Sequence, residues 1–377
     1  MAIADTVFAG SLAPILPSLS ERSDPDWSIG ALVAAHTVGS FVGAVIALVL
    51  STRWSTRALI VWGLAVSIVG CTAFAVSGTQ EHEPLMALAR AAHGFGTAIA
   101  WVGALTWLVS SGSDGRRGSL LGVGVGALLL GGALGPILGW TAVTYGNLWP
   151  FLVLAVAKTV ICLVAAATVP SVSSSGNPLV RLREVRHAGV AGAVVVYALP
   201  AISLGVLNVI GPLELAGGRR TASTIAAVFA IGAVSQSIAS LVMGAWMDRQ
   251  GVRRPVVVAS ALAAVAALLL TGGSYDVALP WLIVAALISF SLLMTPSLAV
   301  LTKHLDDLRV GAASGFALTV LLWSPGSLLG ALGGAWLADA ASRSAAFIVV
   351  AIGMSTAILI GACWGDESRP RAQSADA

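Results

Sequence analysis

Twelve stretches of this chain are continuously apolar over about 20 residues, the length that an α-helix needs to cross the hydrocarbon core of a bilayer. They lie at 1–19, 28–50, 58–77, 84–110, 118–141, 148–169, 188–213, 222–246, 255–273, 278–300, 311–338 and 345–364. Only 10% of the residues are charged and the mean hydropathy is +0.93, whereas about a quarter of the residues in a soluble domain are charged. We therefore expect an all-α membrane protein with twelve transmembrane helices.

Lys and Arg concentrate in cytoplasmic loops, so their positions predict the orientation of the spans. If the N-terminus is inside, the cytoplasmic segments hold fourteen of them: Arg53, Arg57, Arg116, Arg117, Arg181, Arg183, Arg186, Arg249, Arg253, Arg254, Lys303, Arg309, Arg369 and Arg371. The outside loops hold four: Arg22, Arg219, Arg220 and Arg343. We therefore expect an integral protein of the cytoplasmic (inner) membrane with both termini in the cytoplasm.

The chain also divides into two halves of similar size. The segment 171–187 begins with Ser, Gly and Pro, ends with basic residues, and is typical of a cytoplasmic linker. A stripe of glycines at 131, 135 and 139 recurs 195 residues later at 326, 330 and 334. Such a repeat indicates a duplicated six-helix unit. We predict an N-terminal bundle at 1–170, a linker at 171–187, a C-terminal bundle at 188–364 and a cytoplasmic tail at 365–377.

Three motifs carry a family resemblance. The loop after the eighth span reads GAWMDRQGVRR, with motif residues Gly244, Asp248, Arg249, Gly251, Arg253 and Arg254. The fourth span reads RAAHGFGTA from Arg90, with His93 in place of the usual Gln; the fifth reads GGALGPILGW, with motif residues Gly131, Gly135, Pro136 and Gly139. In this order the motifs resemble the major facilitator superfamily, most closely its twelve-span drug/proton antiporters and vesicular amine transporters.

The resemblance implies a secondary transporter rather than an enzyme. In such a transporter, two pseudo-symmetric six-helix bundles surround a central cavity. The implied activity is export of a small organic molecule by alternating access, in exchange for protons. We expect a monomer in the lipid bilayer, with no cofactor or metal, and the net charge of +3 indicates no nucleic-acid partner. The three cysteines also fit no metal-binding spacing. We expect the glycine stripe and the loop charges to serve the conformational change.

Asp5 is the leading site candidate, because a charge within hydrocarbon is costly and is a functional candidate by default. It precedes Pro14 by nine residues, as an Asp does in the first span of the relatives. Their acids in the seventh and tenth spans fall near Asn208 and Ser291 here, so Asp5 is the only acid that we place within a span. We expect protonation of Asp5 to weaken a pairing with Arg90 or His36 and so to shift the conformational balance.

The depth of Asp5 has two interpretations. Counted from Met1, it lies about 6 Å inside the cytoplasmic end of the first helix, where it could act as a cap. The relatives carry more apolar residues ahead of this position. Either the native chain therefore starts upstream of Met1, or the first span is short and Asp5 is more hydrated than in the relatives.

Two further charges fall within spans. Arg90 shares a helical face with Gly94, Thr97 and Trp101. It either faces the central cavity, to pair with Asp5 or an anionic substrate group, or binds backbone carbonyls of the first span. Lys158 lies in the sixth span, which the resemblance implies is peripheral, so we expect its side chain to snorkel towards the membrane surface. The alternative is that Lys158 forms a cationic wall of the cavity.

His36 shares a face with the small residues Ser40, Gly43 and Ala47. It either takes part in proton coupling, for which imidazole titrates in a suitable range, or is a neutral histidine hydrogen-bonded between close helices. The candidates for lining the cavity are His93, Trp101, Tyr197, Asn208, Ser291 and Trp323, with Trp107, Phe41 and Phe290 as further aromatic candidates.

Other classes of function stay open. A uniporter or importer of a neutral or anionic solute would suit spans that hold two cations and one acid. The absence of the acids that the relatives carry in their seventh and tenth spans is also compatible with a homologue that acts as a sensor or scaffold. A membrane-bound enzyme would need a cluster of catalytic groups, and the sequence contains no such motif.

Overall fold

The structure is a computed structural model that describes residues 2–15, 28–79, 82–111, 117–145, 148–171, 188–272, 277–308, 310 and 312–364. The elements of these residues are helices: α1 (Ala2–Gly10), α3 (Ser28–Leu50), α4 (Thr56–Thr79), α5 (Glu83–Ser110), α6 (Arg117–Tyr145), α7 (Leu148–Thr168), α8 (Ala188–Gly217), α9 (Ala222–Gln250), α10 (Arg253–Leu269), α11 (Leu279–Leu292), α12 (Met294–Asp307), α13 (Ala312–Ala340) and α14 (Arg343–Cys363). The linker expected at 171–187 and the tail at 365–377 lie outside the described residues, apart from Ser171.

Within the described part of the chain, nine helices are long and apolar enough to cross a membrane. One of them, Leu279–Asp307, joins α11 and α12 across Leu293. The apolar parts of α1 and α3 are shorter, and α10 has 17 residues. The predicted span 28–50 coincides with α3. The predicted span 1–19 is less regular, since α1 ends at Gly10 and Ser11 forms a turn before helical residues resume at Leu12.

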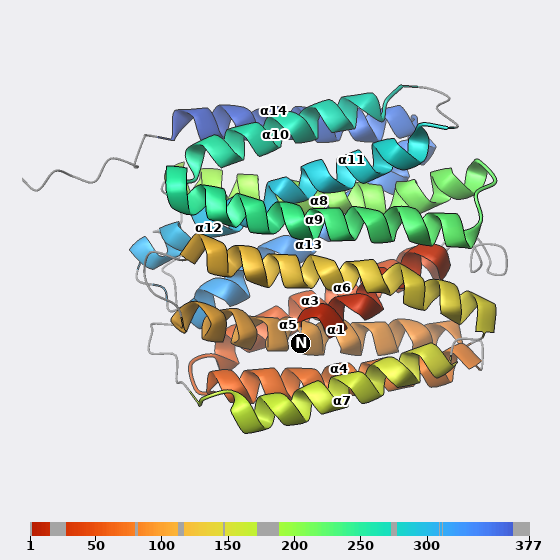
Figure 1. The fold of residues 1–377 in the computed structure, drawn as a ribbon, viewed down its shortest axis with the longest axis vertical. Coiled ribbons are helices and arrows are strands. Elements are labelled where there is room, and N and C mark those ends of the chain that lie inside the picture. The colour runs from red at the N-terminus through yellow and green to blue at the C-terminus, as the bar shows by residue number, and fades with distance from the viewer. Residues whose placement is uncertain are drawn as a thin grey trace, which may run out of the picture.

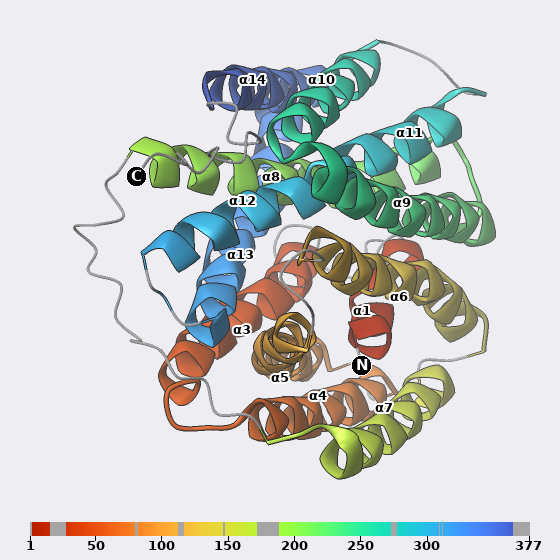
Figure 2. The ribbon, with the colours of Figure 1, turned by 60° about the vertical axis from the view of Figure 1, so that its left-hand side comes forward.

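The helices lie side by side along a common direction (Figure 1). The helices α1 to α7, here called the N-terminal group, occupy the lower part of the view, and α8 to α14, the C-terminal group, occupy the upper part. The two groups meet where α6 packs on α9 and where α3 packs on α13, as the turned view in Figure 2 also shows. Within the N-terminal group, α1 packs on α6 and α4 packs on both α5 and α7.

The glycine stripe lets α1 and α6 approach closely. A Cβ atom on Gly131 would clash with the carbonyl oxygen of Ile3, and one on Gly139 would clash with that of Ser11. The repeated stripe does the same in the C-terminal group, because a Cβ on Gly330 would clash with the carbonyl oxygen of Ile202 in α8. The predicted close helix contact is therefore confirmed, at the α1–α6 and α8–α13 pairs. A role for these seams in the conformational change stays a prediction.

We expect Gly330→Ala to destabilise the protein by about 1–3 kcal/mol, because the added methyl group forces α13 away from α8. Gly333 lies in the same helix and a Cβ there would meet nothing within 4 Å, so Gly333→Ala is the matched control. Thermal unfolding in detergent measures both. Equal unfolding temperatures for the two variants would contradict the tight seam.

Candidate functional site

A buried lysine lies at the centre of the polar network of the N-terminal group. The ammonium of Lys158, on α7, is fully buried, 2.6 Å from the Asp5 Oδ1 of α1 and 2.7 Å from the His93 Nε2 of α5. It also contacts the hydroxyl of Ser67 on α4. The expectation that Lys158 snorkels to the membrane surface is therefore wrong, because a carboxylate, a hydroxyl and an imidazole within the bundle already solvate its charge.

The donors and acceptors of this network fix the positions of its protons. An ammonium has three protons and no lone pair, so Ser67 and His93 accept from Lys158 as Asp5 does. Ser67 can then donate its own proton to Asp5 Oδ1, at 3.0 Å. His93 accepts at Nε2, so its proton lies on Nδ1, which is 3.5 Å from the Nδ1 of His36. A continuous chain of titratable groups thus runs from Asp5 through Lys158 and His93 to His36.

Aromatic rings pack against this network. The ring of Phe8 stacks on His93, with ring centroids 4.1 Å apart, and meets the rings of Phe74 and Phe151 edge-on. Asp5 lies in the first turn of α1 and is 2% exposed, so its carboxylate is buried there rather than hydrated. An ion pair in so apolar a place is strongly coupled, since loss of either partner leaves the other charge uncompensated.

Arg90 does not bind Asp5 directly. Its Nε donates to the carbonyl oxygen of Leu32 on α3, at 3.0 Å, and its guanidinium carbon lies 5.2 Å from the centre of the Phe8 ring. The predicted pairing of Asp5 with Arg90 or His36 is therefore wrong, because Lys158 holds the carboxylate. The alternative prediction, a bond to backbone carbonyls, is right in kind, but the carbonyl belongs to the second span rather than the first.

A cavity of about 390 Å³ lies between the two groups of helices. It is bordered by Asp5, His36, Arg90, Trp101, Tyr197, Asn208 and Trp323 among the predicted site residues, and by Pro136 of the glycine motif. His93 lies behind this wall, against Phe8 and Lys158. Ser291 and Phe290 are fully buried elsewhere, Trp107 packs in another cluster, and Phe41 is exposed on the outer surface.

The cavity also has lining residues beyond the predicted cavity candidates. Gln236 of α9 and Thr97 of α5 border it, together with Phe229 and Met294. Thr97 lies on the same helical face as Arg90 and Trp101, so the predicted face of α5 is the one that borders the cavity. Gln236 was missed because an isolated amide within an apolar helix carries no motif.

The loop motif joins the two groups at one end of the molecule. At this end, here called the basic end, the last turn of α9 lies beside the first turn of α6. The backbone N–H and the hydroxyl of Ser119 in α6 both donate to the carboxylate of Asp248 in α9. Ser51 and Ser314 make a further contact between the groups, at 3.4 Å. Away from this end, in the middle of α9, Ser237 donates to the carbonyl oxygen of Gly126 in α6, at 2.7 Å. The two groups of helices are thus held together at the basic end.

The other motif residues have local roles. Gly251 ends α9 with φ of 74°, a conformation that favours glycine, and Gly244 packs against Gly122 of α6. Arg253 donates to the carbonyl oxygen of Ala362, and Arg254 donates to the side chain of Gln250. Arg249 lies exposed in the last turn of α9. Asp248 contacts Ser119 of α6. The expected role of the loop charges in the conformational change stays a prediction.

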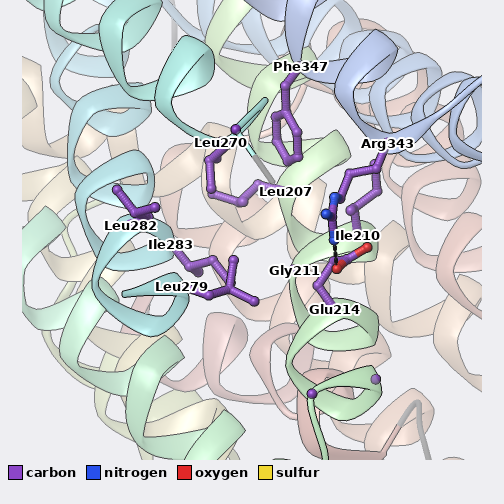
Figure 3. Close-up of a pocket in the computed structure, with 13 residues that line it drawn as sticks. Leu207, Ile210, Gly211, Glu214, Leu270, Leu279, Leu282, Ile283, Arg343 and Phe347 are labelled. Carbon is purple, nitrogen blue, oxygen red and sulfur yellow. Dashed lines mark hydrogen bonds and ion pairs between the residues drawn. The ribbon is translucent and has the colours of Figure 1, made fainter. Parts of the chain in front are cut away.

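A second cavity, of about 240 Å³, lies within the C-terminal group (Figure 3). Glu214 of α8 and Arg343 of α14 form an ion pair beside it, with Phe347 and Leu207 on its apolar side. Glu214 lies in the last turns of α8, so Asp5 is not the only acid within a helical span. The described residues contain no cluster of three or more metal-ligating side chains.

Comparison with known proteins identifies the family. The model of the Major Facilitator Superfamily matches the chain twice, over residues 1–194 and 193–376. The chain belongs to this superfamily: it is an integral membrane protein and a secondary transporter, not an enzyme. No curated protein matches the sequence.

Three solved structures show how general the likeness is. The proton:xylose symporter XylE is similar with a TM-score of 0.78 and 13% identity, over 95% of this chain and 93% of that chain. The human organic anion transporter MFSD10 is similar with a TM-score of 0.72 and 17% identity, over 96% of each chain. The fucose:proton symporter FucP of E. coli is similar with a TM-score of 0.68 and 13% identity, over 96% of this chain and 97% of that chain. At such identities the likeness shows the fold alone.

Proposed function

We propose that the protein is a proton-coupled transporter that moves a small organic molecule through the central cavity by alternating access. In this proposal twelve spans form two six-helix bundles, the protein works as a monomer, and both termini and the basic end face the cytoplasm. The observation that supports the proposal most strongly is the buried Asp5–Lys158 pair at the wall of a cavity between the two groups of helices.

Asp5 is the proposed proton site. A proton on Asp5 removes the negative partner of Lys158, while Ser67 and His93 still accept from the ammonium. Loss of one partner of a buried ion pair costs about 3–5 kcal/mol. A shift from 1:99 to 99:1 between two conformations needs about 5.5 kcal/mol, so this single proton falls short of that complete shift but is large enough to change which of two conformations of similar stability dominates.

The change at Asp5 has a direct route to the interface between the two groups. Asp5 lies on α1, which packs on α6 through the glycine seam, and α6 in turn packs on α9. A small movement of α1 relative to α7 therefore acts on the helix that joins the two groups at the basic end. Opening this end would break the contacts of Ser119 with Asp248 and of Ser51 with Ser314.

The first candidate for the direction of transport is export in exchange for protons, which the resemblance of the fifth-span motif implies. A second candidate is a uniporter or importer of a neutral or anionic solute. The charges favour it, since Arg90 and Asp5 line the cavity and Lys158 lies directly behind Asp5, which gives two cations for one acid. The neighbours described as sugar symporters and an organic anion transporter share the fold and do not decide the substrate. A sensor or scaffold without transport is the remaining alternative.

Proteoliposomes that contain an internal pH probe test the proposal. A panel of organic cations, neutral molecules and anions is added with an outward, an inward or no pH gradient. We expect at least one class to move protons, and the direction of proton movement separates exchange from co-transport. Substrate movement that is the same under all three gradients would contradict proton coupling, and no movement of any compound would favour the sensor.

A further inference from the structure

The charge balance at the central cavity is incomplete. Arg90 and Lys158 are both buried, at 3% and 0% exposure, and Asp5 is bound to Lys158. Among the described residues that line the cavity, Asp5 and Arg90 are the charged ones and His36 is the titratable neighbour. One carboxylate for two cations leaves the site with an excess of one positive charge.

Arg90 carries this excess. Its Nε bonds to a neutral carbonyl and its face lies near Phe8, while one terminal nitrogen, Nη1, has no hydrogen-bond partner among the described residues. A buried donor without an acceptor is destabilising by about 1–3 kcal/mol, and more when it is charged. A guanidinium with a free edge has the geometry that binds a carboxylate or another planar anion.

The second cavity of the molecule provides a contrast. Arg343 also borders a cavity, but Glu214 already neutralises it, as the dashed line in Figure 3 shows. Of these two arginine-lined cavities, the one between the two groups of helices has an arginine without a carboxylate partner among the described residues. An added anion therefore gains a full charge interaction at Arg90 and little at Arg343.

The other walls of the cavity favour an apolar body with a few polar groups. Tyr197 and Trp323 lie with ring centroids 5.9 Å apart, and Trp101 adds a third aromatic ring. The buried hydroxyl of Thr97 has no hydrogen-bond partner among the described residues, and it lies on the Arg90 face of α5. A cavity of about 390 Å³ with apolar walls and few polar groups suits one small organic molecule.

We infer that the central cavity binds a small organic monoanion with an aromatic or apolar body, whose acidic group binds Arg90. This inference rests on the proposed function in that the central cavity is taken as the transport site. It also implies how proton and substrate interact. Protonation of Asp5 raises the charge of the site from one positive charge to two, so a proton and an anion each favour binding of the other. Their binding together supports co-transport rather than exchange.

The test compares probes of one shape and three charges: 2-naphthoate, 2-naphthamide and 2-naphthylmethylammonium, titrated into the purified protein by calorimetry. We expect naphthoate to bind at least ~10-fold more tightly than the other two, a ratio that corresponds to ~1.4 kcal/mol. Arg90→Gln should remove this preference and Arg90→Lys should keep part of it. Arg343→Gln is the control for binding at the second cavity and should change nothing.

A gain of binding separates the inference from simple misfolding of the variants. Asp5→Asn leaves Lys158 without its anion, so naphthoate should bind this variant ~10-fold more tightly than the wild type, as one removed negative charge predicts. Tighter or equal binding of the amide or the ammonium, no measurable binding of naphthoate, or unchanged naphthoate affinity in Asp5→Asn would overturn the anion site.

The pH dependence distinguishes failure of the anion site from failure of the proposed function. The titratable and charged groups around the site are Asp5 on α1, His36 on α3, Cys71 on α4, Arg90 and His93 on α5, Lys158 on α7 and Tyr197 on α8. Naphthoate affinity should rise at lower pH in the wild type and in His36→Gln, but not in Asp5→Asn. Anion preference without any pH dependence would uphold the anion site and contradict Asp5 as the proton site. Proton-coupled transport of cations alone would contradict the anion site and uphold the proposed proton coupling.

Discussion

Lys158→Met should unfold far more readily than the wild-type protein, with a loss of about 3–5 kcal/mol in the free energy of unfolding. The substitution removes the cation that compensates Asp5 at a site where the carboxylate is 2% exposed. Thermal unfolding of the purified protein in detergent measures the loss. The double variant Asp5→Asn with Lys158→Met should recover most of it, because it contains no uncompensated charge.

The exposed ion pair of Glu214 and Arg343 provides the matched control. The side chain of Arg343 is 37% exposed, so water screens the pair, and Arg343→Met should cost at most about 1 kcal/mol. If Lys158→Met and Arg343→Met destabilise the protein equally, the buried pair does not have the strength that the mechanism needs. Additive effects of the two substitutions at Asp5 and Lys158 would contradict their direct coupling.

Asp5→Asn should retain transport of the substrate down its own concentration gradient and should lose the accumulation of substrate that a pH gradient drives. An asparagine cannot take up the proton, so the conformational change no longer depends on protons. With the wild-type protein and one proton per substrate, a gradient of one pH unit supports about tenfold accumulation, and the variant should show none. Uptake into proteoliposomes, using a compound that the wild type transports, measures both quantities.

His93→Gln is the control for this variant. A glutamine carbonyl can still accept from Lys158, and Gln is the residue that the resemblance places in this motif. We therefore expect coupled accumulation to persist in His93→Gln with a reduced rate. If Asp5→Asn still accumulates substrate in response to the pH gradient, another group carries the proton.

The helices and their faces could be predicted because hydropathy and helical period are local properties of the sequence. The span 28–50 coincides with α3, and the predicted face of Arg90, Thr97 and Trp101 borders the cavity. The glycine stripe likewise predicted a close helix contact, since small residues at one spacing leave room for one neighbour.

The partners of the charged residues could not be predicted from these local patterns. Lys158 and Asp5 are 153 residues apart, and only the packing of α1, α4, α5 and α7 brings them together. The assumption of a peripheral sixth span directed attention to Arg90 instead. A signal was present in the sequence: a buried acid needs a cation, and Lys158 was one of two cations within spans. The charge balance of the spans, two cations for one acid, therefore indicates Lys158 as a partner of Asp5 as readily as Arg90.

Proton exchange with solution on substrate binding tests the central claim, that Asp5 carries the coupling proton, most directly. A pH indicator in weakly buffered detergent solution reports protons taken up or released when a saturating ligand, such as 2-naphthoate, binds to the purified protein. The account predicts proton uptake in the wild type and in His93→Gln, and none in Asp5→Asn at equal ligand occupancy. Uptake of the same size in Asp5→Asn would contradict it.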